Sequence, residues 1–418
     1  MDNHIRLQTL DWDEYTKTAR QAAADGIVLL RNEKSVLPLS EGSRVSLFGR
    51  AQLSYYKSGT GSGGMVNVAH VTGIREALEN EKSIRMNREL LHLYDRFNDE
   101  NPPRTGDGWG NDPWSQDEMP VTDAICREAA EESDIAIVLI GRTAGEDRDN
   151  RDEEGSWKLS GLELDLLRKV RAAFGRMAVL LNTGNIIDMS FLDELSPDAV
   201  LYVWQGGMVG GLGVVDVLTG RVNPSGHLTD TIALSLEDYP SAKNFGTGDL
   251  DLYQEDIYVG YRYFDSFDKN VAYPFGYGLS YTTFEYSKPA VKVSGDNITV
   301  SVTVKNTGKV AGKEIAQVYV AAPRGTIEKP CHELKGFAKT RELKPGESQT
   351  LTIQMAKRDL ASFDEANSRW LVEAGQYVFE IGASSRDIRT NVTTSLTAYT
   401  EQVSNVLAPK EKLNLLKR

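Results

Sequence analysis

Four short apolar runs, separated from one another by helical stretches, constrain the first half of this chain more than any other feature. The runs are VSLFG at 45–49, IAIVLIG at 135–141, MAVLLNT at 177–183 and AVLYVWQ at 199–205. Strands that are apolar along their whole length are covered on both faces, and strands that alternate with helices pair in parallel. We therefore predict a layered α/β domain whose mostly parallel sheet carries helices on both faces.

One of the expected helices shows where it starts. The stretch GLELDLLRKVRAAF at 161–174 places leucines and a valine at helical spacing. Ser160 precedes it and Glu163 follows three residues later, which is the spacing of a capping box. We expect the helix to begin directly after Ser160.

The second half of the chain changes to a two-residue alternation of apolar and polar residues. Examples are ITVSVTV, EIAQVYV and QTLTIQM, with turn sequences such as NTG and LKPGES between them. This pattern is typical of an all-β sandwich of the immunoglobulin or fibronectin type III kind. We divide the chain into an α/β domain at 1–245, a connector at 246–290, the sandwich at 291–395, and a tail or linker at 396–418.

Composition excludes several classes of function. The chain has 60 acidic and 47 basic residues, a formal net charge of -13 and no Lys/Arg-rich run, so we expect no nucleic-acid partner. No apolar run approaches the roughly 20 residues of a spanning helix, and the first residues are acidic, so we expect a cytoplasmic protein without a membrane partner. The two cysteines, Cys126 and Cys331, lie far apart and suit a reducing compartment. The five histidines lack metal-ligand spacing, so we expect no metal. The oligomeric state is left open, a homo-oligomer included.

The first candidate for chemistry is the polar segment that follows the run at 135–141. Ligands of open α/β sheets bind beyond the carboxyl ends of the strands, and Glu146 is the first acid past this one. Several further acids and Arg148 follow closely, and crowding of like charges can raise a carboxyl pKa enough to make a general acid. The alternative is a solvated charged loop.

The second candidate is the glycine-rich loop KSGTGSGG at 57–64. Gly59, Gly61 and Gly64 satisfy the dinucleotide pattern G-x-G-x-x-G. However, the loop starts some eight residues after the strand, and no acid about 20 residues on is placed at a second strand's tip. We therefore expect no cofactor. The loop could instead surround a sugar with its backbone amides, or simply be a surface loop.

A longer set of motifs resembles glycoside hydrolase family 3, and it runs in the family's order over roughly residues 15–390. The motifs include AAADGIVLLRNEKSVLPL, KSGTGSGG, LIGRTAGEDRD, VWQGGM, GRVNPSGHLTDT, YPFGYGLSYTTFEYS, VKNTGKVAGKEIAQVYV and HELKGFAKTRELKPGES. The resemblance implies an α/β sandwich domain followed by a fibronectin type III-like domain. It also implies that Glu146 is the catalytic acid/base. The sugar-contacting residues that it implies are Lys57, Ser58, Gly59, Thr60, Gly61 and Arg148.

The chain departs from the family in one respect. Most members begin with a (β/α)8 barrel that carries an aspartate nucleophile in an S-D-W-like motif, and no such motif occurs in this sequence. We expect either an order-inverted member whose barrel follows the sandwich, or a barrel on a separate polypeptide.

The implied function is one part of a retaining β-glycosidase, most simply a β-glucosidase. It would release terminal non-reducing β-D-glucosyl residues from β-linked gluco-oligosaccharides or from aryl and alkyl glucosides. We expect the isolated chain to be inactive. Two alternatives remain: a non-catalytic carbohydrate-binding or scaffold protein, and a dinucleotide-binding oxidoreductase.

Overall fold

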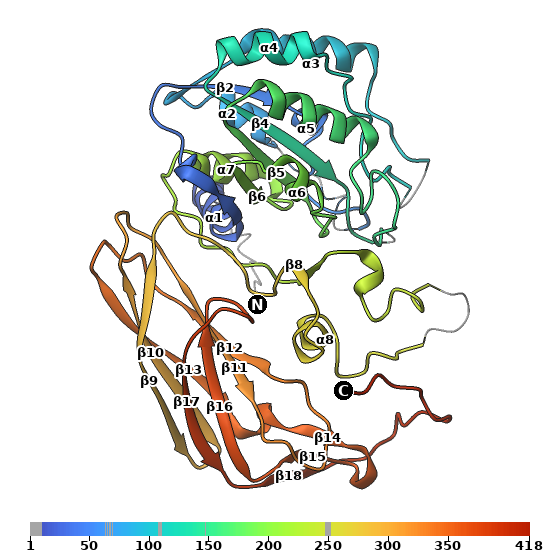
Figure 1. Ribbon diagram of the computed structural model, residues 1–418, viewed down its shortest axis with the longest axis vertical. Coiled ribbons are helices and arrows are strands. Elements are labelled where there is room, and N and C mark those ends of the chain that lie inside the picture. Colours follow the sequence, from blue (N-terminus) through green and yellow to red (C-terminus); the bar gives the residue numbers. More distant parts are fainter. Residues whose placement is uncertain are drawn as a thin grey trace, which may run out of the picture. The chain divides into compact units, whose positions relative to one another are not determined.

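The computed structural model describes residues 11–62, 64, 66, 68, 70–107, 111–146, 148–246 and 252–418 (Figure 1). The chain forms two compact units. The first comprises Met1–Asn185 with Leu195–Pro224, and the second comprises Ile186–Glu194 with Ser225–Arg418. The domain boundaries that we place at 245, 290 and 395 stay a prediction.

The first unit is built on a six-stranded sheet in the order β1-β6-β5-β4-β2-β3. All pairs are parallel except β1 with β6, so the predicted mostly parallel α/β sheet is confirmed. Every residue of β4, β5 and β6 is buried, which is why these strands read as unbroken apolar runs. The bounds are β1 Val28–Asn32, β2 Ser43–Phe48, β3 Ile84–Met86, β4 Ile135–Arg142, β5 Met177–Thr183 and β6 Ala199–Tyr202.

Helices cover both faces of this sheet. Helices α4 and α5 pack together over one face, and α1, α2 and α7 pack together over the other (Figure 1). The predicted capping box is present: the Ser160 hydroxyl accepts the Glu163 N–H, and the Glu163 carboxylate accepts the Ser160 N–H. The helices of the first unit are α1 Trp12–Gly26, α2 Ile74–Glu79, α3 Arg88–Glu100, α4 Asp123–Glu132, α5 Gly161–Ala173 and α7 Gly210–Leu218. Helix α6, Phe191–Leu195, falls almost wholly in the second unit.

The second unit contains the predicted β-sandwich. Its two main sheets have the orders β13-β10-β9 and β12-β11-β16-β17. Residues 298, 300, 302 and 304 of β10 are fully buried and pack in one core with residues from β11 and β16, as the two-residue alternation predicts. The strands are β9 Phe284–Ser294, β10 Asn297–Asn306, β11 Ile315–Ala321, β12 Glu333–Lys339, β13 Ser348–Ala356, β16 Gly375–Gly382 and β17 Ile388–Leu396.

Smaller elements complete the second unit. A third sheet has the order β14-β15-β18, and β7 pairs with β8. The bounds are β7 Ile232–Ala233, α8 Tyr261–Ser266, β8 Val271–Tyr273, β14 Ser362–Asp364, β15 Arg369–Val372 and β18 Tyr399–Gln402. Strand β18 lies in the segment that we expect to be a tail. The sequence does not predict this strand, because four residues are too few to show an alternation.

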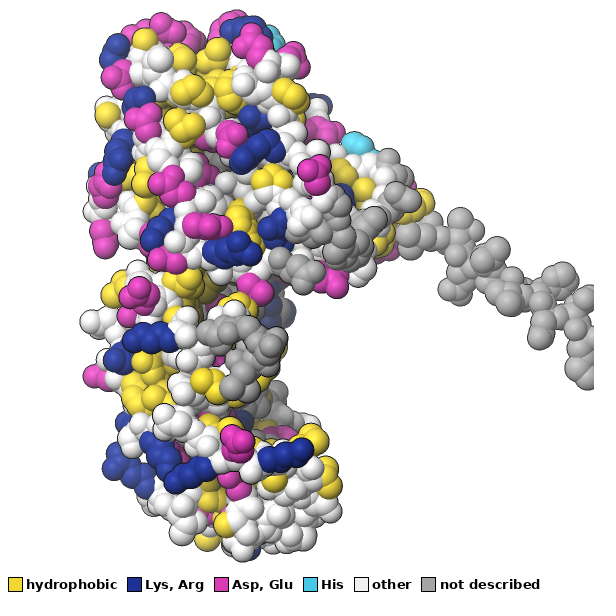
Figure 2. Space-filling view, turned by 90° about the vertical axis from the view of Figure 1, so that its right-hand side faces the viewer, with side chains coloured by type: hydrophobic (Ala, Val, Ile, Leu, Met, Phe, Trp, Pro, Cys, Tyr) yellow, Lys and Arg dark blue, Asp and Glu magenta, His cyan; other side chains and the backbone are white. Residues whose placement is uncertain are grey.

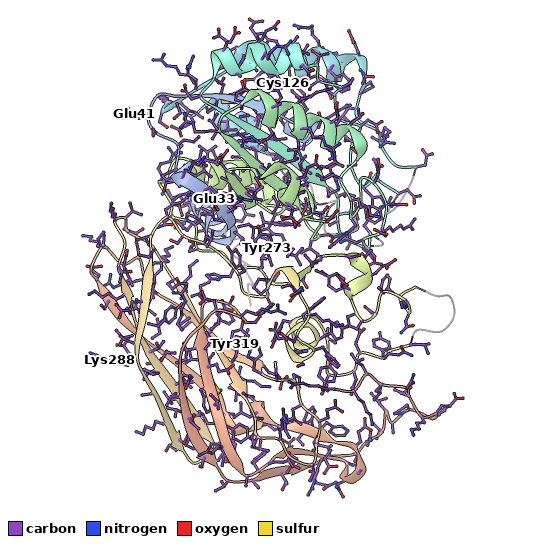
Figure 3. The ribbon with its side chains drawn as sticks, viewed as in Figure 1. Glu33, Glu41, Cys126, Tyr273, Lys288 and Tyr319 are labelled. Carbon is purple, nitrogen blue, oxygen red and sulfur yellow. The ribbon has the colours of Figure 1, made fainter. Side chains whose placement is uncertain are left out.

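The structure shows how the charged side chains are distributed, whether the cysteines are paired, and how long and apolar the helices are. On the face shown in Figure 2, acidic and basic side chains are interspersed over the α/β domain. Both cysteines are free, and burial raises the pKa of the Cys126 thiol on α4 to about 11 (Figure 3). Within the described ranges, no helix has the length and apolarity to cross a membrane.

Candidate active site

The sheet order defines where a ligand site is expected. From β2 the chain crosses to β3 on one side, whereas from β4 it crosses to β5 on the other side. The carboxyl ends of β2 and β4 therefore form a topological switch point, where open α/β sheets open a crevice. The glycine-rich loop continues from β2, and the segment with Glu146 continues from β4.

These two loops contact each other, although the sequence separates them by more than 80 residues. The Thr60 N–H donates to the Ala144 carbonyl over 2.6 Å, and the Thr60 hydroxyl donates to the Glu146 carbonyl over 3.1 Å. The Ser62 N–H lies 3.4 Å from Oε2 of Glu146. Glu146 is exposed. The structure thus presents its carboxylate at the switch point, beside the loop from which the sequence predicts sugar contacts.

Three glycines permit this close approach. A Cβ on Gly61 would lie 2.6 Å from Cβ of Glu146, and a Cβ on Gly145 would lie 2.6 Å from the Thr60 nitrogen. A Cβ on Gly59 would lie 2.8 Å from the Ala144 carbonyl oxygen. Gly61 and Gly145 also have φ values of +90° and +126°, which disfavour any other residue. Gly59 and Gly61 of the KSGTGSGG loop therefore serve loop-to-loop packing.

The cationic residues predicted for the site lie on the same two loops. Nζ of Lys57 donates to the Ser58 hydroxyl over 3.2 Å. The Arg148 N–H donates to the Gly145 carbonyl, and the Arg148 guanidinium carbon lies 4.8 Å from the centre of the Trp114 ring. The sequence analysis missed Trp114, because it lies in a segment without any periodic pattern.

Three of the acids that follow Glu146 have partners of their own. Asp152 pairs with Lys158 at 2.8 Å, and Glu153 accepts a hydrogen bond from the Trp114 indole over 3.2 Å. Glu154 accepts the Gly161 N–H at the start of α5. The charge-crowding hypothesis for Glu146 is not tested by these contacts.

Polar groups whose burial no sequence pattern predicted lie at the end of β4, on α5 and in the segment between α3 and α4. Arg142 at the end of β4 is 2% exposed and forms two hydrogen bonds with Glu163, at 2.6 and 2.7 Å. Burial alone would lower the pKa of Arg142, but the charge and hydrogen bonds of Glu163 outweigh it and raise that pKa. Burial raises the pKa of Glu118 to about 7, although the Arg50 and Met119 N–H groups donate to its carboxylate.

The geometry does not fit the dinucleotide alternative. Strand β2 ends at Phe48 and helix α2 begins only at Ile74, so the glycine-rich loop at 57–64 neither ends a strand nor opens a helix. A dinucleotide fingerprint requires both, because the pyrophosphate binds at the helix N-terminus.

Comparison with known proteins shows the family of this chain. Residues 27–281, more than half of the chain, match the family described as Glycosyl hydrolase family 3 C-terminal domain. The chain belongs to glycosyl hydrolase family 3. Residues 314–385, within the β-sandwich, match a Fibronectin type III-like domain. Both domains that the sequence motifs imply are therefore confirmed.

Family 3 relatives match nearly the whole chain. A beta-glucosidase of Ruminococcus albus is 51% identical, over 96% of this chain and 43% of the relative. The crystal structure of a beta-glucosidase from Paenibacillus barengoltzii superposes with a TM-score of 0.92 at 44% identity, over 96% of this chain and 46% of that one. The structure of beta-glucosidase 3B from Thermotoga neapolitana in complex with glucose gives a TM-score of 0.88 at 39% identity, over 94% of this chain and 56% of that one.

The family 3 chain therefore spans about half the length of these relatives. The residues that the structure describes form the α/β domain and the β-sandwich with its connecting segments, and they contain no (β/α)8 barrel.

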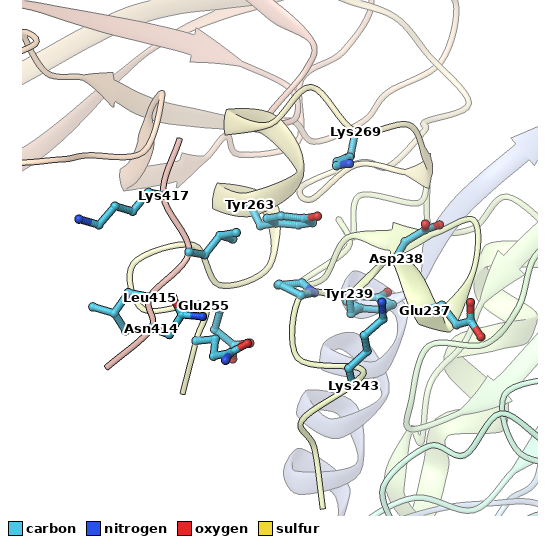
Figure 4. Close-up of a pocket in the computed structure, with 13 residues that line it drawn as sticks. Glu237, Asp238, Tyr239, Lys243, Glu255, Tyr263, Lys269, Asn414, Leu415 and Lys417 are labelled. Atoms are coloured by element: carbon cyan, nitrogen blue, oxygen red, sulfur yellow. The ribbon is translucent and has the colours of Figure 1, made fainter. Parts of the chain in front are cut away.

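A separate pocket of about 480 Å³ lies in the second unit (Figure 4). Two tyrosines, Tyr239 and Tyr263, line it together with charged side chains that include Lys243 and Glu255. None of the residues that the family resemblance implies for the site lines this pocket.

Proposed function

We propose that this chain supplies the general acid/base of a retaining β-glycosidase, and that Glu146 is that residue. The observation that carries the proposal is the exposed Glu146 carboxylate at the switch point, next to a glycine-rich loop that presents its backbone. The names of the relatives support a β-glucosidase that acts on terminal β-D-glucosyl residues of oligosaccharides or of aryl and alkyl glucosides.

Retaining hydrolysis requires a second carboxylate. One carboxyl group protonates the leaving oxygen, while the other, which lies about 5–5.5 Å from the first, attacks the anomeric carbon. The first group then removes a proton from the water that hydrolyses the glycosyl-enzyme. Glu146 serves in the protonation and in the water step. The nucleophile is an aspartate of a (β/α)8 barrel, in the same protein or in a partner chain.

In this proposal, the sugar is contacted by residues of the two loops: Lys57, Ser58, Gly59, Thr60, Gly61 and Arg148. Backbone N–H groups and short side chains of the loop suit sugar hydroxyls, which donate and accept hydrogen bonds. The contact between this loop and Glu146 supports the assignment, because a proton donor must lie beside the bound glycosidic oxygen.

The first experiment measures hydrolysis of an aryl β-glucoside by the chain alone and after a family 3 barrel is supplied, as a fusion or as a separate chain. We expect turnover only with the barrel. Robust turnover by these 418 residues alone would refute the division of the two carboxylates between two domains.

The second experiment tests the role of Glu146 in the reconstituted enzyme. Glu146→Gln should lower kcat by about 10²- to 10⁴-fold for poor leaving groups and much less for activated aryl glucosides, because only the former need a proton. Azide should restore turnover to Glu146→Ala on activated substrates. Asp149→Asn, an exposed acid of the same loop, is the matched control and should leave kcat unchanged. Equal losses on all substrates without azide rescue would show that Glu146 is not the proton donor. Glu146 would then have a structural role, or the chain would be a non-catalytic carbohydrate-binding protein.

We also propose a cytoplasmic location, because both cysteines are free and suit a reducing compartment. Cell fractionation with an antibody against the chain tests this proposal, and recovery outside the cytoplasm would contradict it.

A further inference from the structure

Asn182 is a fully buried polar residue near the end of β5, a strand whose first five residues are apolar. It lies on β5, between Leu181 and Thr183, and its exposed fraction is 0%. Burying a side-chain amide is unfavourable unless its hydrogen bonds are made inside the protein. The contacts of Asn182 therefore indicate why this strand tolerates it.

The Asn182 amide binds the backbone of two different loops. Its Oδ1 accepts the Tyr56 N–H over 2.9 Å, and its Nδ2 donates to the Tyr56 carbonyl over 3.0 Å. The same Nδ2 donates to the Trp204 carbonyl over 2.6 Å. One side chain on β5 thus fixes both polar backbone groups of Tyr56, in the loop after β2, and one carbonyl in the loop after β6.

This clamp lies at the root of the segment that contacts Glu146. Tyr56 directly precedes Lys57, whose carbonyl accepts the Gly207 N–H over 2.8 Å. Three residues further, Thr60 makes its hydrogen bonds to the loop of Glu146. Trp204 has a φ of +53°, which is strained for a residue with a side chain, and the hydrogen bond from Asn182 helps to hold it.

We propose that Asn182 is a positioning residue that sets the sugar-contacting loop against Glu146, although it touches neither the substrate nor Glu146. This inference rests on the proposed function only for its effect on turnover. The placement of the loop follows from the contacts of Asn182 alone.

The chemistry of the clamp specifies an amide. The side chain must accept one hydrogen bond and donate two, and only an amide supplies acceptor and donors together at this size. An aspartate would keep the acceptor but would turn a carboxylate oxygen toward the carbonyls of Tyr56 and Trp204. Replacing a donor by a charge in a buried site removes the hydrogen bonds and adds repulsion.

The test compares Asn182→Asp with a matched variant at a second buried clamp. Asn306, in the β-sandwich, is also 0% exposed, and its Nδ2 donates to the Val310 and Leu343 carbonyls. Asn306→Asp therefore imposes a similar buried change in the other compact unit. Hydrogen–deuterium exchange of the peptide that covers residues 55–62 is the first readout, and it needs no catalysis. Steady-state kinetics of the barrel-reconstituted enzyme is the second.

We expect Asn182→Asp to speed exchange of residues 55–62 at least about tenfold, because the hydrogen bonds that hold the loop are lost. We also expect it to lower kcat about 10- to 100-fold, because a displacement of the loop by about 1 Å can reduce the rate by this factor. Asn306→Asp should leave both readouts within about twofold wherever both variants are folded. Exchange that changes equally in the two variants would overturn the proposal. If Asn182→Asp does not fold, Asn182→Ser, which is neutral and smaller, takes its place with the same expectations.

The two proposals fail in different ways. If Glu146→Gln shows no dependence on the leaving group while exchange at 55–62 still responds to Asn182, the proposed function is wrong and the clamp stands. If Glu146 behaves as a proton donor but exchange does not respond, the clamp is wrong and the proposed function stands.

Discussion

At the scale of single residues, the candidate site depends on glycines, because they have no side chain and leave room for the neighbouring loop. The sequence motifs place Glu146 after a strand and glycines in a second loop, but neither motif states that the two loops contact each other. That contact follows from tertiary structure, because Gly61 leaves the space that the side chain of Glu146 occupies. Trp114 and Asn182 were not predicted, because Trp114 lies in an aperiodic segment and Asn182 is one of two polar residues that end a buried apolar run.

Gly61→Ala tests this packing. The new Cβ would meet Cβ and Oε2 of Glu146, at 2.6 and 2.5 Å, in a backbone with φ of +90°. We expect the free energy of unfolding to fall by about 1–3 kcal/mol and kcat/KM of the reconstituted enzyme to fall about 10- to 100-fold. Urea unfolding and an aryl glucoside assay measure the two effects.

The control separates backbone strain from the clash. Gly42 has a φ of +80°, but a Cβ there would meet nothing within 4 Å. Gly42→Ala should therefore cost stability through strain alone and leave kcat/KM unchanged. If both substitutions had the same effects on stability and turnover, the packing of Gly61 on Glu146 would not matter.

At the scale of elements, the sequence predicts the parts whose pattern has a local cause. The strands β2, β4, β5 and β6 were predicted because each contains a run of buried, mostly apolar residues. The short edge strands β1 and β3 were missed, since edge strands are only partly buried and carry charged residues such as Arg31 and Arg85. Strand β18 was missed because its pairing with β15 is its main determinant. The strand order, and with it the switch point, is a property of long-range pairing that no local pattern contains.

Glu163→Gln tests how α5 is joined to β4. Glu163 caps the start of α5 and binds the buried guanidinium of Arg142, so the substitution leaves that charge without its carboxylate. We expect the free energy of unfolding to fall by about 3–5 kcal/mol in urea titrations followed by circular dichroism. Asp152→Asn breaks the ion pair of Asp152 with Lys158, in which both side chains are 48% exposed, and should cost at most about 1 kcal/mol. Equal losses would show that the Arg142–Glu163 pair contributes no more than a surface pair.

At the scale of the whole molecule, stability should depend on pH through His332. Its ring nitrogens lie 2.7 Å from Oε2 of Glu380 and 3.3 Å from Oδ2 of Asp265, which also binds Arg386. Burial alone would lower the pKa of His332, but the hydrogen bonds to Asp265 and Glu380 outweigh it and raise the pKa to about 9. A raised pKa stabilises the folded state fully below the unfolded value of about 6.5, and this contribution is lost as pH rises through 9.

We therefore expect the free energy of unfolding to decrease by about 1–3 kcal/mol between pH 6 and pH 10 because of His332. Urea titrations at several pH values measure this change. His332→Gln, which cannot be protonated, should reduce the slope between pH 6.5 and 9, and an unchanged slope would show that His332 does not control it.

Thermal unfolding of the chain with added ligands distinguishes the glycosidase hypothesis from the oxidoreductase hypothesis. A dinucleotide bound with a dissociation constant of about 10 μM would, at about 1 mM, stabilise the folded chain by about 2.7 kcal/mol. That is an increase of several degrees in Tm for domains of this size. Because the glycine-rich loop is joined to the loop of Glu146 and opens no helix, we expect NAD to leave Tm unchanged. We expect the same of glucose with the chain alone, since the proposed function leaves most sugar contacts to the barrel. Once the barrel is present, glucose should raise Tm. A Tm that rises with NAD concentration would restore the oxidoreductase hypothesis, and a Tm that rises with glucose in the isolated chain would favour a carbohydrate-binding protein that needs no barrel.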